Sequence, residues 1–198
     1  MTPDREASAR LPEQETPAVP GRIHGLRGWS LYEEGPFRRL GSRTRAMIWP
    51  PNDNMVAACL GSEDSAAHPA PAPGCHCGIH AHHPFGAGVE VLAESLATPE
   101  SGFANGIGWT VYGVISAWGR VEVHADGFRA ERARPVALLI ARNWHDTTYG
   151  RAIEETAAEY VLPVIIVEPD PKAIAAACAE RWPGLAPALV DELLLSVR

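Results

Sequence analysis

The chain has 198 residues, of which 46% are hydrophobic and 21% are charged, and its formal net charge is −7. This length and composition suit one globular domain with a core of ordinary size. An acidic chain without a long basic run is not expected to be a general nucleic-acid binder. No stretch approaches the roughly 18 to 20 consecutive apolar residues of a membrane span, so we expect no membrane partner either.

The cysteine count and the N-terminal composition predict a cytoplasmic protein. Four cysteines are too few for a disulfide-stapled secreted scaffold. The first residues contain no apolar segment of the kind that a secretory signal requires. The thiols are therefore expected to be reduced. Residues 1–22, rich in Pro, Glu, Ala and Ser, are expected to form a disordered tail, so that residues 23–198 make up a single α+β domain.

The first half of this domain shows short, weakly patterned elements. Strand-like runs occupy residues 28–32, 45–49 and 55–60, and a short helix is expected at residues 89–96. From residue 109 to 124 apolar and polar side chains alternate, as in a strand with one buried face. Asp126-Gly127 then predicts a two-residue hairpin turn.

The second half is more regular. The return strand is expected at residues 128–134, interrupted by Pro135 before an apolar strand at residues 136–141. Thr148 is expected to cap a helix over residues 149–160, followed by a buried strand at 164–167. Asp170 before Pro171 predicts the start of a helix, and a last helix covers residues 186–197. The fold class is therefore α+β, an antiparallel β core with packed helices and a C-terminal βαβα unit.

The strongest chemical signal is a loop at residues 59–88 that is dense in Gly and Pro. It carries three of the four cysteines and five of the eight histidines. A loop of this length inside a compact domain is uncommon unless it is functional or fixed by a ligand. Zinc takes four tetrahedral ligands from thiolate sulfur and imidazole nitrogen, and such an ion would order the loop.

The expected zinc ligands are Cys59, Cys75, Cys77 and His124, with His68 and His80 as secondary candidates for the fourth position. An iron–sulfur cluster or copper is also compatible with these residue types. Cys-x-Cys is not a common zinc-ribbon spacing, however, and Cys59 follows apolar residues. Cys59 is equally well explained as a small buried side chain, and the histidines are equally well explained as solvated loop residues.

The hairpin suggests a second kind of chemistry. With a turn at Asp126-Gly127, Glu122 faces Glu131 across the ladder, on the same sheet face as His124. The candidate catalytic residues are then Cys75, Cys77, Glu122, His124 and Glu131. In this interpretation the two carboxylates and the imidazole act as acid/base groups beside a thiol or metal centre. The alternative is a solvated charged face balanced by arginines, which we favour.

Two segments resemble a mostly actinobacterial family of uncharacterised bacterial proteins. They are Cys-His-Cys-Gly-Ile-His-Ala (75–81) and Trp-Gly-Arg-Val-Glu-Val-His-Ala-Asp-Gly-Phe-Arg-Ala-Glu (118–131). The family pattern has a tyrosine at the position of His80 and a glutamate at that of Ala125. The resemblance implies that Cys75, Cys77 and His124 belong to one pattern. It implies no activity, because none is established for the family.

These observations leave three functions open. The first is a small cytoplasmic metal-binding protein, with zinc, in a binding or regulatory role toward a protein partner or a small molecule. The second is a thiol- or metal-dependent enzyme that uses the residues of the hairpin. The third is a metal-delivery protein, because a Cys-x-Cys segment flanked by histidines suits soft ions such as Cu(I).

Overall fold

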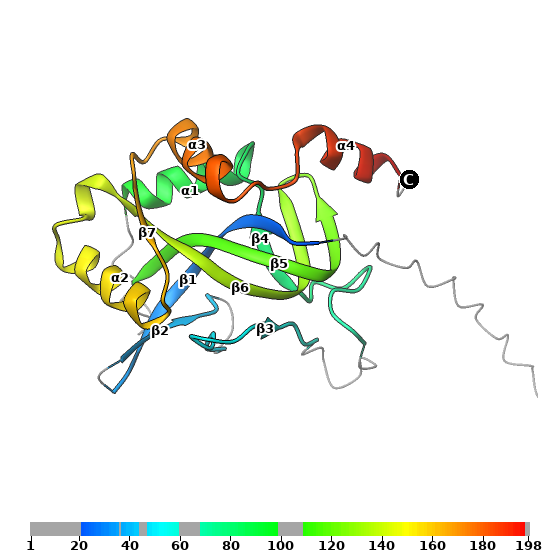
Figure 1. Ribbon diagram of the computed structural model, residues 1–198. Helices are drawn as coiled ribbons and strands as arrows, with labels where there is room; N and C mark the ends of the chain where they lie inside the picture. Colours follow the sequence, from blue (N-terminus) through cyan, green and yellow to red (C-terminus); the bar gives the residue numbers. More distant parts are fainter. Residues whose placement is uncertain (1–20, 36, 44–46, 60–67, 99–108, 197–198) are drawn as a thin grey trace, which may run out of the picture.

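A computed structural model describes residues 21–35, 37–43, 47–59, 68–98 and 109–196 (Figure 1). Within these residues it has four α-helices, one 3₁₀ turn and one mixed sheet, which confirms the α+β class. The strands are β1 (Ile23–Glu34), β2 (Phe37–Gly41), β3 (Met55–Val56), β4 (Ile79–His82), β5 (Thr110–His124), β6 (Gly127–Ala141) and β7 (Val164–Val167). Almost all of the expected N-terminal tail, and part of the strand expected at 45–49, lie outside the described residues.

Strand β6 organises the sheet. One of its edges pairs with β5 to form a long hairpin. Along its other edge β6 pairs in turn with β4, with β3 and, in parallel, with β7. β1 pairs with β5 on one side and meets β4 at Leu26 and His82, so that β1, β5, β6 and β4 form a closed ring of pairings. Segments distant in sequence are thereby brought side by side along β6.

The hairpin register differs from the expected one. The two turn residues are Ala125 and Asp126, and His124 pairs with Gly127 as the first residue of β6. Gly127 is already inside the ladder, where a Cβ would lie 2.1 Å from the carbonyl oxygen of Ala81 on β4. The close approach of β4 therefore requires glycine at this position of the strand, rather than in the turn.

We expected Pro135 to interrupt its strand, but it does not. β6 runs through it to Ala141, and Pro135 pairs with Ile115. The ladder changes register between Val114 and Ile115, so that Val136 has no partner on β5. Such a bulge accommodates a residue without a backbone N–H inside a sheet.

The helices are α1 (Ala87–Ala97), α2 (Thr148–Glu159), α3 (Pro171–Arg181) and α4 (Pro187–Ser196). Asp170 caps α3 through the backbone N–H of Ala173, as the sequence predicted. The cap of α2 is Thr147, one residue before the expected Thr148, and its hydroxyl accepts from Gly150. β6, α2, β7 and α3 form the expected βαβα unit.

Side chains of β6 alternate between two apolar clusters on opposite faces of the sheet. Leu138 and Ile140 pack with Ile153 of α2, whereas Leu139 packs with α1 and with Ile174 of α3. All of these side chains are buried, and burying a large aliphatic side chain contributes about 1.5–3 kcal/mol. Helices α1 and α3 lie together on one side of the sheet (Figure 1). The sheet is therefore a firm support for the loops that lead into β3 and β4.

Candidate metal centre

Three thiols meet because β3 and β4 follow each other along one edge of β6. β3 pairs at Arg132 and Ala133, and β4 pairs from Gly127 to Ala130. Cys59 follows the end of β3 at Val56, and Cys77 lies two residues before the start of β4 at Ile79. An isolated antiparallel β-bridge pairs Ala58 with Pro69. Cys59 directly follows the first of these residues and His68 directly precedes the second, so the bridge brings them close together.

The segment that carries Cys75 and Cys77 is a tight turn held against β6. The backbone N–H of Cys75 donates to the carbonyl of Ala72 at 3.2 Å. Gly78 has φ +119°, and a Cβ there would meet the Cβ of Arg129 at 3.0 Å. Glycine is needed at this position both for its backbone conformation and for the close contact with β6.

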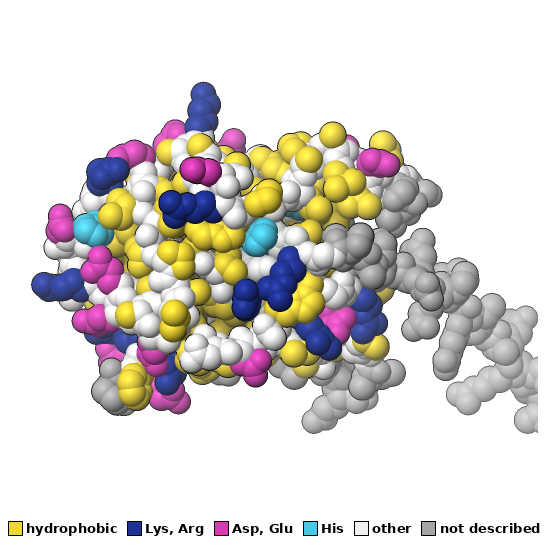
Figure 2. Space-filling view, viewed as in Figure 1, with side chains coloured by type: hydrophobic (Ala, Val, Ile, Leu, Met, Phe, Trp, Pro, Cys, Tyr) yellow, Lys and Arg dark blue, Asp and Glu magenta, His cyan; other side chains and the backbone are white. Residues whose placement is uncertain are grey.

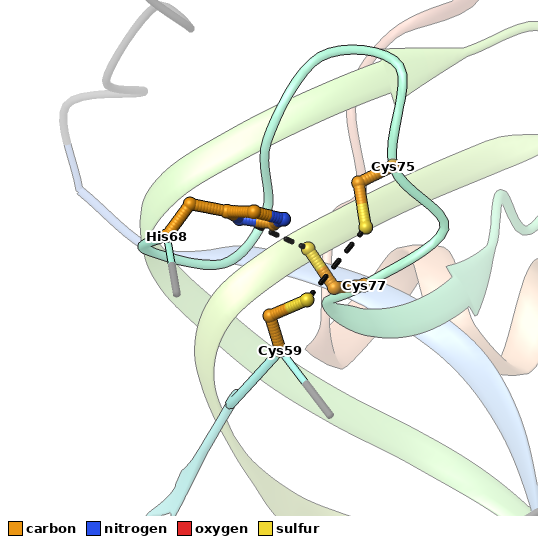
Figure 3. Close-up of side chains that lie close together, drawn as sticks. All are labelled: Cys59, His68, Cys75 and Cys77. Carbon is orange, nitrogen blue, oxygen red and sulfur yellow. Dashed lines mark hydrogen bonds between the residues drawn. The ribbon is translucent and has the colours of Figure 1, made fainter. Parts of the chain in front are cut away.

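The candidate ligand atoms of Cys59, His68, Cys75 and Cys77 all lie within 4.8 Å of one another (Figure 3). The sulfurs of Cys59 and Cys75 are 3.8 Å apart, and the sulfur of Cys77 is 3.9 Å from Nδ1 of His68. Two thiolates bound at about 2.3 Å to one tetrahedral zinc ion lie about 3.8 Å apart. Three sulfurs and one imidazole at these separations fit a closed, four-ligand metal site.

The thiols of the metal-free chain differ in acidity. The pKa of Cys75 is lowered to about 7, chiefly because the backbone N–H of Cys77 hydrogen-bonds to its sulfur. The pKa of Cys77 is raised to about 11, because partial burial disfavours its thiolate and its thiol donates to Cys75. A hydrogen bond to the carbonyl of Pro69 raises the pKa of His68. Metal ligands must be deprotonated, so an ion that binds here displaces the proton of Cys77.

Arg129 holds the backbone around the two cysteines. Its side chain is only 7% exposed, and Nη1 donates to the carbonyl of Cys75 and, at 3.2 Å, to that of Cys77. On its other side, Nη2 lies 2.5 Å from a carboxylate oxygen of Glu122, and Nε donates to Nε2 of His124 at 3.3 Å. Arg129 thus connects the hairpin to the cysteine loop through the backbone and leaves the sulfurs free.

His124, our expected fourth ligand, lies away from the thiols. It pairs with Gly127 at the tip of the hairpin, and its Nε2 accepts the hydrogen bond from Arg129, whose guanidinium separates it from the cysteine loop. The nitrogen beside the sulfurs belongs to His68, one of the two secondary candidates. The other, His80, donates to the carbonyl of His76 at 3.0 Å and is outside the cluster.

The carboxylate pair expected across the hairpin is not formed. The actual register places Glu122 opposite Arg129, and the two form an ion pair. Glu131 lies beside a bulge at Gly119, which has φ +83°, and accepts from the backbone N–H of Arg120 at 3.2 Å. That hydrogen bond lowers the pKa of Glu131. Both carboxylates are therefore paired with arginine side chains or backbone donors. The face that we favoured as solvated is largely buried at the Arg129–Glu122 pair.

His68 was only a secondary candidate in the sequence, and the contact of Arg129 with the cysteine loop was not expected. His68 lies between Cys59 and Cys75 in the chain, so a loop that closes the site needs no distant segment, and this was the available signal. The contacts of Arg129 go to backbone carbonyls, which carry no residue-type signature. His83, which resembled a loop residue, is fully buried, stacks on Phe85 and donates to the carbonyl of His124.

Comparison of the chain with family models, curated proteins and solved structures gave no match. The class of the site therefore rests on its geometry, which defines a Cys₃His cluster able to hold a metal ion. Helices in the described part of the chain are all too short or too polar to cross a membrane.

Proposed function

We propose that this protein is a cytoplasmic zinc-binding protein in which Cys59, His68, Cys75 and Cys77 hold one ion. The observation that carries the proposal is the convergence of these four ligand atoms within 4.8 Å from three separate parts of the loop. The donor set, three sulfurs and one imidazole nitrogen, is the kind that structural zinc sites use.

The position of the cluster favours a structural role for the ion. It would tie the end of β3 to the start of β4, across the segment 60–67. A site with four protein ligands is coordinatively saturated and leaves no open position for a substrate. We therefore infer a binding or regulatory role, in which the ion shapes a surface rather than performs chemistry.

The same arrangement weakens the enzyme alternative. Glu122 and His124 would be its acid/base groups, but both are engaged by Arg129. One observation still favours thiol chemistry, namely the lowered pKa of Cys75, since a thiolate is the reactive form of cysteine. We also infer that the chain shares its site with the actinobacterial family that it resembles, because the Cys-x-Cys pair of the motif lies in the cluster.

The test is elemental analysis with an absorption spectrum, on protein purified without added metal and without a histidine tag. We expect one colourless zinc ion per chain, absent from the Cys75→Ser/Cys77→Ser variant. The matched control is Cys178→Ser, because Cys178 is buried in the core outside the cluster. Coloured protein with iron would indicate a cluster instead, and weakly held copper would indicate delivery. A metal-free wild-type chain that also fails to take up added zinc would refute the proposal.

A further inference from the structure

A row of exposed arginines and one half-buried tryptophan crosses three neighbouring strands. Trp118 of β5 pairs with Arg132 of β6, and the register of β1 and β5 places Arg22 beside Trp118 on the other side. Cross-strand partners in an antiparallel sheet project from the same face. The Arg22 guanidinium lies 4.6 Å from the centre of the Trp118 ring, so the two form a stacked pair.

Next to this row the sheet is hollowed. Arg134, two residues beyond Arg132, projects from the same face and lines a cleft of about 440 Å³. The other walls include the side chains of Asn52 and Asn54 before β3 and the half-buried ring of Trp182 after α3. The cleft offers hydrogen-bonding amides and an indole beside a cationic row. Asp53 also lines it, and its carboxylate accepts a hydrogen bond from the backbone N–H of Asn54 at 2.7 Å.

The charges of this surface are unbalanced. Arg120 and Arg132 share a single carboxylate, that of Glu131, at 3.6 and 3.4 Å. Arg22 and Arg134 form no ion pair within the residues that the structure describes. On other parts of the surface, arginines face their own acids, as in the pairs Arg38–Glu155, Arg39–Glu159 and Arg142–Glu168. Figure 2 shows Lys and Arg side chains gathered on the surface below α4.

We propose that this face binds single-stranded nucleic acid. Phosphates would contact Arg132 and Arg134, which project about 6.7 Å apart along one strand. A base would stack on the pair formed by Arg22 and Trp118, and a neighbouring base would enter the cleft against Trp182. A duplex hides the faces of its bases, so a platform with stacked rings favours a single strand.

The acidity of the whole chain does not argue against this surface. The net charge of −7 suggested no nucleic-acid partner, but it averages over the molecule. Exposed charges are screened beyond about 10 Å at 0.1 M salt, so the local excess of arginine decides what binds here. The proposal is independent of the metal site.

The test is fluorescence anisotropy of a labelled oligothymidylate of about 16 nucleotides, titrated with the full chain as purified. Each phosphate contact to a single strand contributes about −0.7 to the slope of log affinity against log salt. The two phosphate contacts, at Arg132 and Arg134, therefore predict a slope of about −1.4, which is roughly a sevenfold weakening between 50 and 200 mM salt.

Matched variants locate the surface. Arg22→Gln/Arg132→Gln is expected to weaken binding at least about tenfold and to halve the salt slope. The control Arg142→Gln/Arg151→Gln removes the same charge from exposed positions after β6 and on α2, and should change the affinity less than about twofold. Trp118→Leu should weaken oligothymidylate binding about tenfold while leaving any binding of heparin, which has no bases, unchanged.

Three results would overturn the proposal. One is the absence of an anisotropy change at low salt. Another is an equal loss of oligonucleotide affinity in the control variant, which would mean that binding depends on the overall charge and not on this face. The third is competition by thymidine monophosphate as effective, per nucleotide, as the oligomer, which would make the cleft a mononucleotide site. Circular dichroism of each variant separates a lost contact from a lost fold.

Discussion

Replacing Arg129 by methionine should weaken both the fold and the metal site. Methionine fills a similar volume and removes every polar contact of the guanidinium. The carbonyls of Cys75 and Cys77 lose their donor, and Glu122, with a side chain 23% exposed, loses its closest cation. Breaking a buried ion pair costs about 3–5 kcal/mol. Because Glu122 is partly solvated, we expect a loss near the lower limit, about 3 kcal/mol of unfolding free energy in the metal-free chain.

The effect on metal affinity follows from the same contacts. Arg129 fixes the backbone from which two of the sulfurs project, so without it the ion must order the loop by itself. Outer contacts of this kind change metal affinity by about 10–100-fold, and we expect Arg129→Met to fall in that range. Arg129→Lys keeps the charge, but its single nitrogen cannot serve both carbonyls and Glu122 at once. It should lose about tenfold.

Competition with a chromophoric zinc chelator measures the affinity, and urea unfolding with and without zinc measures the stability. Arg134→Met is the control, since Arg134 is an exposed residue of the same strand without an ion pair in the described part of the chain. If Arg129→Met binds zinc within about twofold of the wild type, the loop does not depend on this clamp and the reasoning fails. An equal loss in Arg134→Met would refute it as well.

Three further results are expected. Val161 follows the C-cap of α2 with φ +53°, a left-handed conformation that favours glycine, and its side chain is 80% exposed. Val161→Gly should therefore raise the unfolding free energy by about 1 kcal/mol in a urea titration, and a lower unfolding free energy would contradict this. Burial raises the pKa of Cys178 from 9.0 to about 11, so its stabilisation is complete below pH 9 and is lost as the pH rises toward 11. The stability of the wild type should therefore fall relative to Cys178→Ala by up to about 3 kcal/mol between pH 8 and 11, and parallel pH profiles would exclude the effect. In metal-free protein at pH 7, iodoacetamide should modify Cys75 before Cys77 and Cys178, and peptide mass mapping that finds Cys77 first would reverse our assignment of their acidities.

Elements whose signals are local were predictable from the sequence. Asp170 and Pro171 begin α3 because an N-cap oxygen and a preset φ act within one turn of chain. The alternation from residue 109 to 124 gave the bounds of β5 within one residue, but the expected single buried face was wrong for its first half, because the residues from Thr110 to Ala117 are buried on both faces of the sheet. The parallel pairing of β6 and β7 follows from the helix between them.

Register was less predictable, because it depends on distant partners. Asp126-Gly127 is a strong hairpin signal, yet the contact of Gly127 with β4 moved the turn back by one residue. Pro135 would end an isolated strand, but a bulge and its neighbours keep it inside β6. In both cases the pairing with another strand, β4 for Gly127 and β5 for Pro135, decided between two locally acceptable arrangements.

The sequence predicted the three cysteines of the candidate site, but not which histidine lies beside them. Cys59, Cys75 and Cys77 were grouped from their proximity in sequence, and they do lie together. The choice between His68 and His124 depended on where the hairpin tip points, which follows from the hairpin register. The ion pair of Arg129 with Glu122 depended on the same register, so one shift of the turn changed the interpretation of both groups.

The dependence of the cluster on β6 also sets an order of events during synthesis. Cys77 and Arg129 are separated by 52 residues, so the cysteines leave the ribosome well before the strand that will hold them. The β5–β6 hairpin closes locally, whereas β3 and β4 join it only across long loops, which are slow to close. The three thiols are therefore exposed together on an unfolded segment while the rest of the domain is made. If the cluster holds an ion, as we propose, the nascent chain must acquire it or be kept reduced before the fold can protect the thiols.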